Sequence, residues 1–193
     1  MSFLLESKKM ADNNLSAIKA VIFDAVGVLF SHVVVFDSEK GEIFRHRSHI
    51  DGQGISFLRS AGIKVAFISS DKNGFLESLT NKLNNLPSVL SGKWEPIKLF
   101  SGISSSEKLG VIEEWLKESK LSFSDLAYMG DDIGDYDVMK KCSFPVCPIS
   151  AEKFIKDISV FVSERPGGEG AIRDFCNAVL ESKEISIFDL SSK

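Results

Sequence analysis

Polar side chains that can bind cations or anions follow several short apolar runs in this chain. Asp24 comes directly after Val-Ile-Phe, Ser69 after Val-Ala-Phe-Ile, and Asp131 and Asp132 after Leu-Ala-Tyr-Met-Gly. A carboxylate placed at the end of a buried run is costly to desolvate unless it has a cation, hydrogen bonds or a function. Because the carboxyl ends of parallel strands share one edge of a sheet, we expect these side chains to converge there.

The convergence of three carboxylates indicates a cation site. Carboxylates that meet at one point raise each other's pKa, and a hard divalent cation relieves this repulsion. A few carboxylates with water suit Mg²⁺. Asp135 lies one helical turn beyond Asp131 and can face the same cation or orient its ligands. Lys108, near the start of a predicted helix, can supply a positive charge to an anionic substrate.

Each of these residues also has a purely structural interpretation. Asp131 and Asp132 can cap a helix and complement its dipole, and Ser69 can be another cap. Lys108 alone is typical of a solvated surface lysine. The occurrence of all of them in order, each at a strand end or on the helix that follows, favours a functional site.

The elements that position these residues alternate between strands and helices, which predicts a parallel sheet with helices on both faces. The predicted strands cover residues 19–23, 63–68, 97–100, 126–129, 144–147 and 160–162. The predicted helices cover residues 75–86, 106–117, 133–141 and 171–180, with a short helix or arm at 3–12. A further helix is expected to begin with Asp51 as its N-cap and to end at Gly62.

The domain organisation follows from the same pattern. Segments His32–Phe36 and Glu42–His46, joined by a polar turn, predict a β-hairpin flap over about residues 31–47. No internal repeat or linker is present, so we expect one α/β domain over residues 1–182 with no large cap, and a C-terminal tail at 183–193.

Composition narrows the class of protein. The 193 residues are 44% hydrophobic and carry a formal net charge of −4, which argues against a nucleic-acid binder. No apolar run approaches the ~20 residues of a membrane span. The N-terminal segment lacks the apolar core of a signal peptide, and three cysteines form no CxxC motif. We therefore expect a cytoplasmic protein with reduced, buried thiols.

Motifs in chain order resemble a known family. They are FDAVGVL (23–29) in the place of a DxDGVL motif, DGQGI (51–55), ISS (68–70), Lys108, YMGDDIGDYDVM (128–139) and GGEGAIRD (167–174). In this order they resemble the haloacid-dehalogenase superfamily, within it the cap-less phosphatases of 3-deoxy-octulosonate 8-phosphate and sialate 9-phosphate. The resemblance covers roughly residues 17–182. The chain is also similar to the phosphatase-like C-terminal domain of animal CMP-sialate synthetases.

The resemblance implies a Rossmann-like fold, a phosphorylated sugar acid as ligand, and a homotetramer in which neighbouring subunits complete the site. Asp24 would be the nucleophile, while Ser69 and Lys108 would bind the phosphoryl oxygens and stabilise charge. Ser70 and Gly27 complete the implied substrate-binding set. The implied Mg²⁺ ligands are Asp24, the main-chain carbonyl of Val26 and Asp131, with Asp132 and Asp135 close behind.

Three departures from the family pattern point to weakened hydrolysis. Val26 stands where the family has the aspartate that protonates the leaving oxygen and then activates water, a contribution worth ~10²–10⁴-fold in rate. Asp71 replaces a positive residue near the expected phosphate, and Glu169 stands where the subgroup often has arginine. Mg²⁺ binding is expected to persist, because Val26 supplies only a backbone oxygen.

Three interpretations therefore stay open. A histidine of the hairpin region, His32, His46 or His49, is chemically suited to replace the missing acid in an active phosphatase. Alternatively, the fold serves as a non-catalytic oligomerisation or regulatory module associated with sugar activation. A different chemistry on the same fold is the third interpretation, although the sequence offers neither a Schiff-base lysine nor a cap domain in its support.

Overall fold

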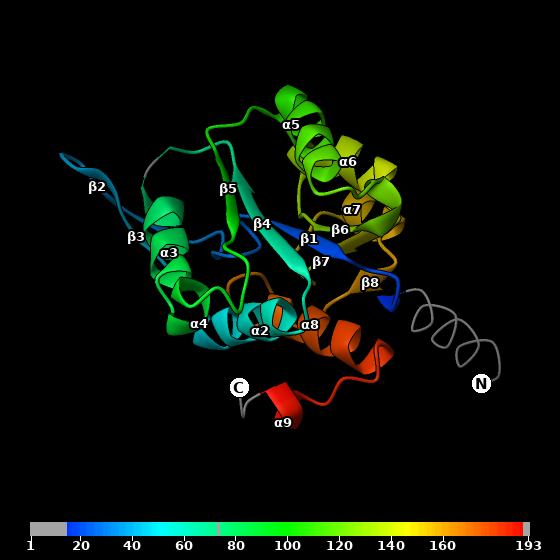
Figure 1. The fold of residues 1–193 in the computed structure, drawn as a ribbon. Helices are drawn as coiled ribbons and strands as arrows, with labels where there is room; N and C mark the ends of the chain where they lie inside the picture. The colour runs from blue at the N-terminus through cyan, green and yellow to red at the C-terminus, as the bar shows by residue number, and fades with distance from the viewer. Residues whose placement is uncertain (1–14, 73, 191–193) are drawn as a thin grey trace.

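A six-stranded parallel sheet forms the centre of the protein (Figure 1). The structure is a computed structural model that describes residues 15–72 and 74–190, so the arm expected at 3–12 lies outside the described residues. The strands are β1 (Ala20–Asp24), β4 (Lys64–Ser69), β5 (Lys98–Ser101), β6 (Leu126–Met129), β7 (Phe144–Cys147) and β8 (Phe161–Val162). Their spatial order is β5-β4-β1-β6-β7-β8, and each neighbouring pair is parallel. The α/β fold class predicted from the sequence is confirmed.

Helices cover both faces of this sheet (Figure 1). Val21 and Phe23 of β1 belong to the core under α2, α3 and α8, whereas Ala20 and Ile22 belong to the core under α5, α6 and α7. This alternation is the period-2 pattern of a strand buried on both sides. The helices are α2 (His49–Ser60), α3 (Phe75–Asn84), α4 (Pro87–Leu90), α5 (Ser105–Glu118), α6 (Tyr136–Lys141), α7 (Lys153–Ile158), α8 (Ala171–Ser182) and α9 (Ile187–Leu190).

Several sequence-based element predictions need correction. Helix α2 begins at His49, so Asp51 is not its N-cap but lies in its first turn. Helices α4 and α7 were not predicted, the first of them because Pro87–Pro96 reads as irregular from its composition. The segment expected to be a tail contains α9, and its Leu190 is buried at 7% exposure in the core, so the chain packs against the domain as far as that residue.

The predicted hairpin is present and projects away from the sheet (Figure 1). It consists of β2 (Val34–Asp37) and β3 (Gly41–Arg45), which pair antiparallel. Its apolar side chains are largely exposed, with Phe36 at 70% and Phe44 at 56% of their full accessible area. The hairpin therefore has an apolar surface that this domain leaves uncovered.

Two further expectations concern the chain as a whole. Within residues 15–72 and 74–190, no helix is both long and apolar enough to cross a membrane. The three cysteines, Cys142, Cys147 and Cys176, are buried and form no disulfide, as expected of small apolar fillers.

Asp51 has a structural role that its position in the sequence does not reveal. Its side chain is buried at 1% exposure and accepts hydrogen bonds from the backbone N–H groups of Gly170 (3.1 Å) and Arg173 (2.9 Å). It therefore caps the N-terminus of α8 from a different helix, satisfying donors that the first turn of a helix leaves unpaired. This contact fixes α2 against α8 on one face of the sheet.

Replacing this carboxylate tests its capping role. Asp51→Ala leaves two buried donors unsatisfied and should lower the free energy of unfolding by about 2–4 kcal/mol. The measurement is urea unfolding followed by circular dichroism. Asp37→Ala is the matched control, because Asp37 accepts from two backbone N–H groups in the exposed hairpin turn, and its loss should cost less than about 1 kcal/mol. Equal losses in the two variants would contradict the structural role of Asp51.

Candidate functional site

The topology of the sheet brings three of the predicted residues to one edge. Asp24 is the last residue of β1, and Ser69 is the last residue of the adjacent β4. Asp131 follows β6, which pairs with β1 on its other side. The strand order reverses at β1, and such a switch point is where open α/β sheets form their binding crevices.

A cavity of about 210 Å³ lies at this edge. Its lining residues are Asp24, Val26, His32, Ser69, Ser70, Ser105, Lys108, Asp131, Asp132, Gly134 and Asp135. This lining contains every residue of the predicted site except Gly27. Ser105 and Gly134 were not predicted, because neither carries a motif that separates it from an ordinary helix start or turn.

Lys108 lies at the centre of the charged side chains. A capping box between Ser104 and Glu107 starts α5 immediately before it. Its Nζ atom donates to Asp24 Oδ1 at 2.8 Å and to Asp135 Oδ1 at 2.7 Å. At 4% exposure Lys108 is not the solvated surface lysine that its sequence context alone suggests.

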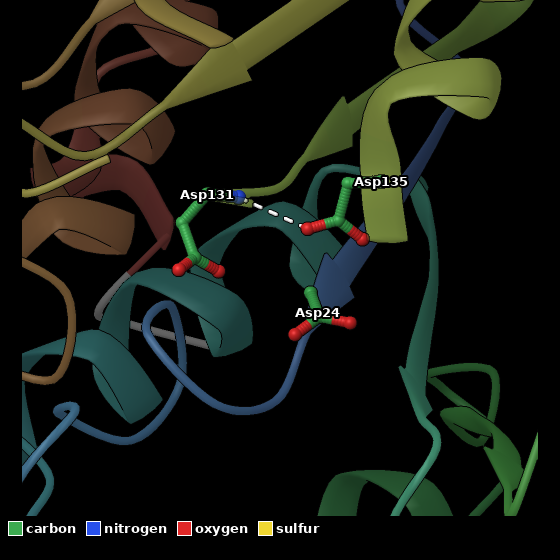
Figure 2. Close-up of side chains that lie close together, drawn as sticks. All are labelled: Asp24, Asp131 and Asp135. Atoms are coloured by element: carbon green, nitrogen blue, oxygen red, sulfur yellow. Dashed lines mark hydrogen bonds between the residues drawn. The ribbon is translucent and has the colours of Figure 1, made fainter. Parts of the chain in front are cut away.

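The three aspartates converge, as Figure 2 shows. Asp24, Asp131 and Asp135 are all buried, and one carboxylate oxygen from each lies within 4.8 Å of the others. When all are ionised, they face a single ammonium at Lys108, which leaves two negative charges in excess. This buried oxygen donor set suits a divalent cation, so the cluster can hold a metal ion.

The close packing of buried charges shifts the pKa values of Asp24, Asp131 and Lys108. Burial, followed by the charge of Asp135, raises the pKa of Asp24 well above its ordinary value, although Lys108 opposes the shift. Burial and the neighbouring carboxylates of Asp135 and Asp132 raise the pKa of Asp131 to about 8. Burial lowers the pKa of Lys108, but Asp24 and Asp135 outweigh this effect and raise it overall.

Asp135 has hydrogen bonds at both of its carboxylate oxygens. Oδ1 accepts from Lys108 and from the Tyr128 hydroxyl at 2.6 Å, while Oδ2 accepts from the backbone N–H of Asp131 at 3.0 Å (Figure 2). Gly130 makes room for it, since a Cβ atom there would lie 2.5 Å from Asp135 Cγ. Tyr128 was not among the predicted site residues, although a tyrosine in a buried strand needs a hydrogen-bond partner.

Asp131 packs between a glycine and a histidine. Its Oδ2 atom lies 2.8 Å from His32 Nε2. Gly27 adopts φ +85°, and a Cβ atom there would lie 2.2 Å from Asp131 Oδ2. A side chain at position 27 would thus collide with the carboxylate, so Gly27 shapes the site through its lack of one. Of the three candidate histidines, only His32 contributes to the lining of this cavity.

Ser69 and Asp132 also line the cavity, but they differ in how far their side chains are exposed to solvent. Ser69 is buried, and its hydroxyl accepts from the backbone N–H of Asp71 at 3.1 Å. Asp132 is exposed and caps the following turn by accepting from Ile133 N at 2.6 Å. It is therefore outside the carboxylate cluster, although it lines the cavity.

Two of the three departures from the family pattern lie outside the cavity lining. Asp71 does not line this cavity; its Oδ2 atom lies 3.2 Å from Nη2 of Arg45, a hairpin residue with a buried side chain. Asp71 thus contacts a cation away from the cavity lining, and the same Arg45 also binds Glu42. Glu169 is exposed and also lies outside the lining. Val26 does line the cavity, and its side chain offers no proton donor there.

Comparison with known proteins agrees with this geometry. No protein-family profile matches the chain. The 3-deoxy-D-manno-octulosonate 8-phosphate phosphatase KdsC of Salmonella typhi is 28% identical over 163 residues, which are 84% of this chain and 79% of that protein. A Legionella pneumophila hydrolase of the HAD superfamily, subfamily III A, superposes with a TM-score of 0.85 at 22% identity, over 100% of this chain and 97% of that one.

The chain is therefore similar in sequence to KdsC phosphatases, and it shares the fold of a hydrolase of the haloacid-dehalogenase superfamily. Among solved structures, a protein described as a YrbI-family phosphatase from Pseudomonas syringae is 28% identical with a TM-score of 0.83, covering 95% of this chain and 97% of that one. The 3-deoxy-D-manno-octulosonate 8-phosphate phosphatase of Moraxella catarrhalis, in complex with magnesium, phosphate and KDO, has a TM-score of 0.81 at 20% identity, covering 96% and 99%. Both share the fold of this chain.

The excess negative charge of the aspartate cluster predicts how replacement of Asp131 changes stability and the response to Mg²⁺. Asp131→Asn removes one of the crowded charges, so in EDTA, above about pH 8, it should raise the free energy of unfolding by ~1–3 kcal/mol and Tm by roughly 2–8 °C. The same variant should lose the Tm increase that Mg²⁺ gives the unmodified protein, as differential scanning calorimetry will measure. Asp132→Asn is the control and should keep that increase, because Asp132 lies outside the cluster. A full Mg²⁺ response in Asp131→Asn would refute the cation site.

Proposed function

We propose that this protein is a Mg²⁺-dependent phosphatase of the 3-deoxy-octulosonate 8-phosphate or sialate 9-phosphate type, with turnover weakened by Val26. One observation carries the proposal: Lys108 contacts Asp24 at the edge of a cavity that Asp131 and Ser69 also line. The Asp24 carboxylate can accept a phosphoryl group, and the Lys108 ammonium beside it is a fixed positive charge. The KdsC relatives act on a phosphorylated sugar acid, which supports that class of substrate.

Asp24 is proposed as the nucleophile. Its carboxylate oxygen attacks phosphorus, the bond between phosphorus and the sugar oxygen breaks, and that oxygen leaves with the electron pair. Lys108 and Ser69 bind the phosphoryl oxygens as charge develops on them, with Ser70 and the Gly27 loop beside them. Water then cleaves the aspartyl-phosphate, releasing phosphate and restoring Asp24.

Mg²⁺ is the proposed cofactor, held by the carboxylates of Asp24 and Asp131 and by the main-chain carbonyl of Val26. The bound cation supplies charge neutralisation for the phosphoryl group. Asp135 is better suited to position Lys108 and the Asp131 backbone, because both of its oxygens already accept hydrogen bonds. Asp132 lies at the cavity as an outer carboxylate. The hard, all-oxygen donor set supports Mg²⁺.

Val26 is the reason for proposing weakened turnover. The leaving sugar oxygen needs a proton, and the water that attacks the aspartyl-phosphate needs a base. The valine side chain supplies neither. The first step is therefore expected to be slow for a sugar leaving group and less impaired for p-nitrophenol, which leaves without protonation.

Restoring a carboxyl group tests this assignment. Val26→Asp should raise phosphate release by ~10²–10⁴-fold over the unmodified protein on octulosonate 8-phosphate or sialate 9-phosphate with Mg²⁺. Val26→Asn is the matched control and should give no such gain, since an amide cannot transfer the proton. Asp24→Asn should be silent on every substrate, including p-nitrophenyl phosphate. The assay is colorimetric phosphate release, and turnover by Asp24→Asn would contradict the proposed nucleophile.

The alternative function is a non-catalytic oligomerisation or regulatory module associated with CMP-sialate or related sugar activation. Val26 favours it, because loss of the proton donor matters little to a domain that only binds or assembles. Silence of both the unmodified protein and Val26→Asp across the whole substrate panel supports this alternative over the phosphatase.

We propose a homotetramer assembled through the hairpin β2–β3. Phe36 and Phe44 expose large apolar area on this projecting element, and exposed patches of this kind mark interaction sites. We also propose a single domain with the hairpin as its flap; it was expected over residues 1–182, and α9 beyond that range packs against its core. A cytoplasmic location is also proposed, supported by three buried cysteines that form no disulfide.

Introducing charged residues on the β2–β3 hairpin tests whether the proposed tetramer assembles through it. The double substitution Phe36→Glu and Phe44→Glu should lower the molar mass measured by sedimentation equilibrium toward that of the 21.3 kDa chain, while circular dichroism stays unchanged. Phe188→Glu is the control, because Phe188 in α9 is similarly exposed at 80% but lies far from the hairpin in the fold (Figure 1). An unchanged mass in the double variant rules out this interface.

A further inference from the structure

His32 lies directly against the carboxylate that the cation site needs. Its Nε2 atom is 2.8 Å from Asp131 Oδ2, and both side chains line the same cavity. The imidazole is 51% exposed whereas the Asp131 side chain is 5% exposed, so an accessible group contacts a buried one. The phosphatase chemistry proposed above leaves this contact without a role.

We propose that His32 is a positioning residue that holds Asp131 in the orientation in which it binds a divalent cation. The inference deepens the proposed function and rests on its cation site. It assigns to His32 neither metal ligation nor the role of the missing acid.

The surroundings of Asp131 explain why its carboxylate needs a fixed partner. Asp135 and Asp132 repel it, and burial disfavours its charge. Its backbone N–H is fixed by Asp135 at 3.0 Å, but this bond does not orient the carboxylate. The imidazole engages Oδ2 and leaves the second oxygen for a cation. Hydrogen bonds of this kind orient ligand carboxylates in metal sites generally.

Gly27 restricts the same pair from a second side. A Cβ atom built on Gly27 would lie 2.2 Å from Asp131 Oδ2 and 2.6 Å from His32 Nε2. The contact between His32 and Asp131 therefore requires glycine at position 27, because a side chain there would collide with both residues. This close approach is a property of the fold and not of a freely moving surface side chain.

The hairpin fixes the backbone that carries His32. The N–H of Ser31 donates to the carbonyl of His46 at 2.9 Å, which closes the base of the hairpin next to His32. When Asp131 is ionised, the Nε2–H of a neutral imidazole is a sufficient donor, so the contact does not require a charged histidine. The hairpin base thus supplies one wall of the cation site.

Calorimetric titration of Mg²⁺, and separately of Co²⁺, into the metal-free full chain tests the inference without measuring activity. His32→Ala should weaken binding of both ions by ~10–100-fold, the usual effect of removing a partner of a metal ligand. His32→Gln, whose amide can donate from a similar place, should stay within about threefold of the unmodified protein. His46→Ala is the matched control, because His46 is exposed outside the cavity, and should not change binding.

The outcomes separate this inference from the proposed function. Unchanged affinity in His32→Ala overturns the positioning role while the cation site stands. Loss confined to Co²⁺ also overturns it, because a direct nitrogen ligand favours the transition metal over Mg²⁺. Absence of Mg²⁺ binding in the unmodified protein overturns the cation site itself, and the inference with it.

Discussion

The site depends on one buried ammonium that is shared between two carboxylates. Lys108 contacts Asp24 and Asp135 from the first turns of α5, on the opposite side of β1 from α2 and α8. Desolvating these charges is expensive, and their mutual attraction offsets the cost only if the geometry is held by further hydrogen bonds. Tyr128 and the backbone of Asp131 provide those bonds to Asp135. Because one ammonium at Lys108 cannot neutralise three ionised aspartates, the cluster keeps an excess of negative charge and is able to hold a metal ion.

The backbone arrangement makes this concentration of charge possible. Strand β1 has β4 and β6 as parallel neighbours, so side chains that follow all three strands meet without any long loop having to reach the site. Gly27 and Gly130 then allow the approach of the carboxylates, since a Cβ atom at either position would collide with Asp131 or Asp135. Gly27 and Gly130 thus have a steric role: without a side chain, they leave room for the carboxylates of Asp131 and Asp135.

Much of this arrangement could be predicted from the sequence, because strands and their polar ends leave local signals. Apolar runs that end in Asp24, Ser69 and the Asp131–Asp132 pair placed these residues at one edge, and the structure brings them to one cavity. Contacts between distant segments could not be predicted. Asp51 looked like a local helix cap but caps α8 instead, and the His32–Asp131 contact spans 99 residues. Such pairings depend on tertiary packing, for which a single sequence carries no periodic signal.

The departures from the family pattern differ in where they act. Arg45 contacts Asp71 outside the cavity, and Glu169 is exposed, so neither places a negative charge among the residues that line it. Val26 does line it, and it lies two residues after Asp24 in the chain. In the proposed phosphatase, the charged groups assigned to the phosphate and to the cation are therefore all present, and the missing group is the proton donor. On this proposal, Val26 would impair turnover while the charged groups of the site stay in place. The positioning role proposed for His32 would likewise not depend on turnover, because it concerns the orientation of Asp131.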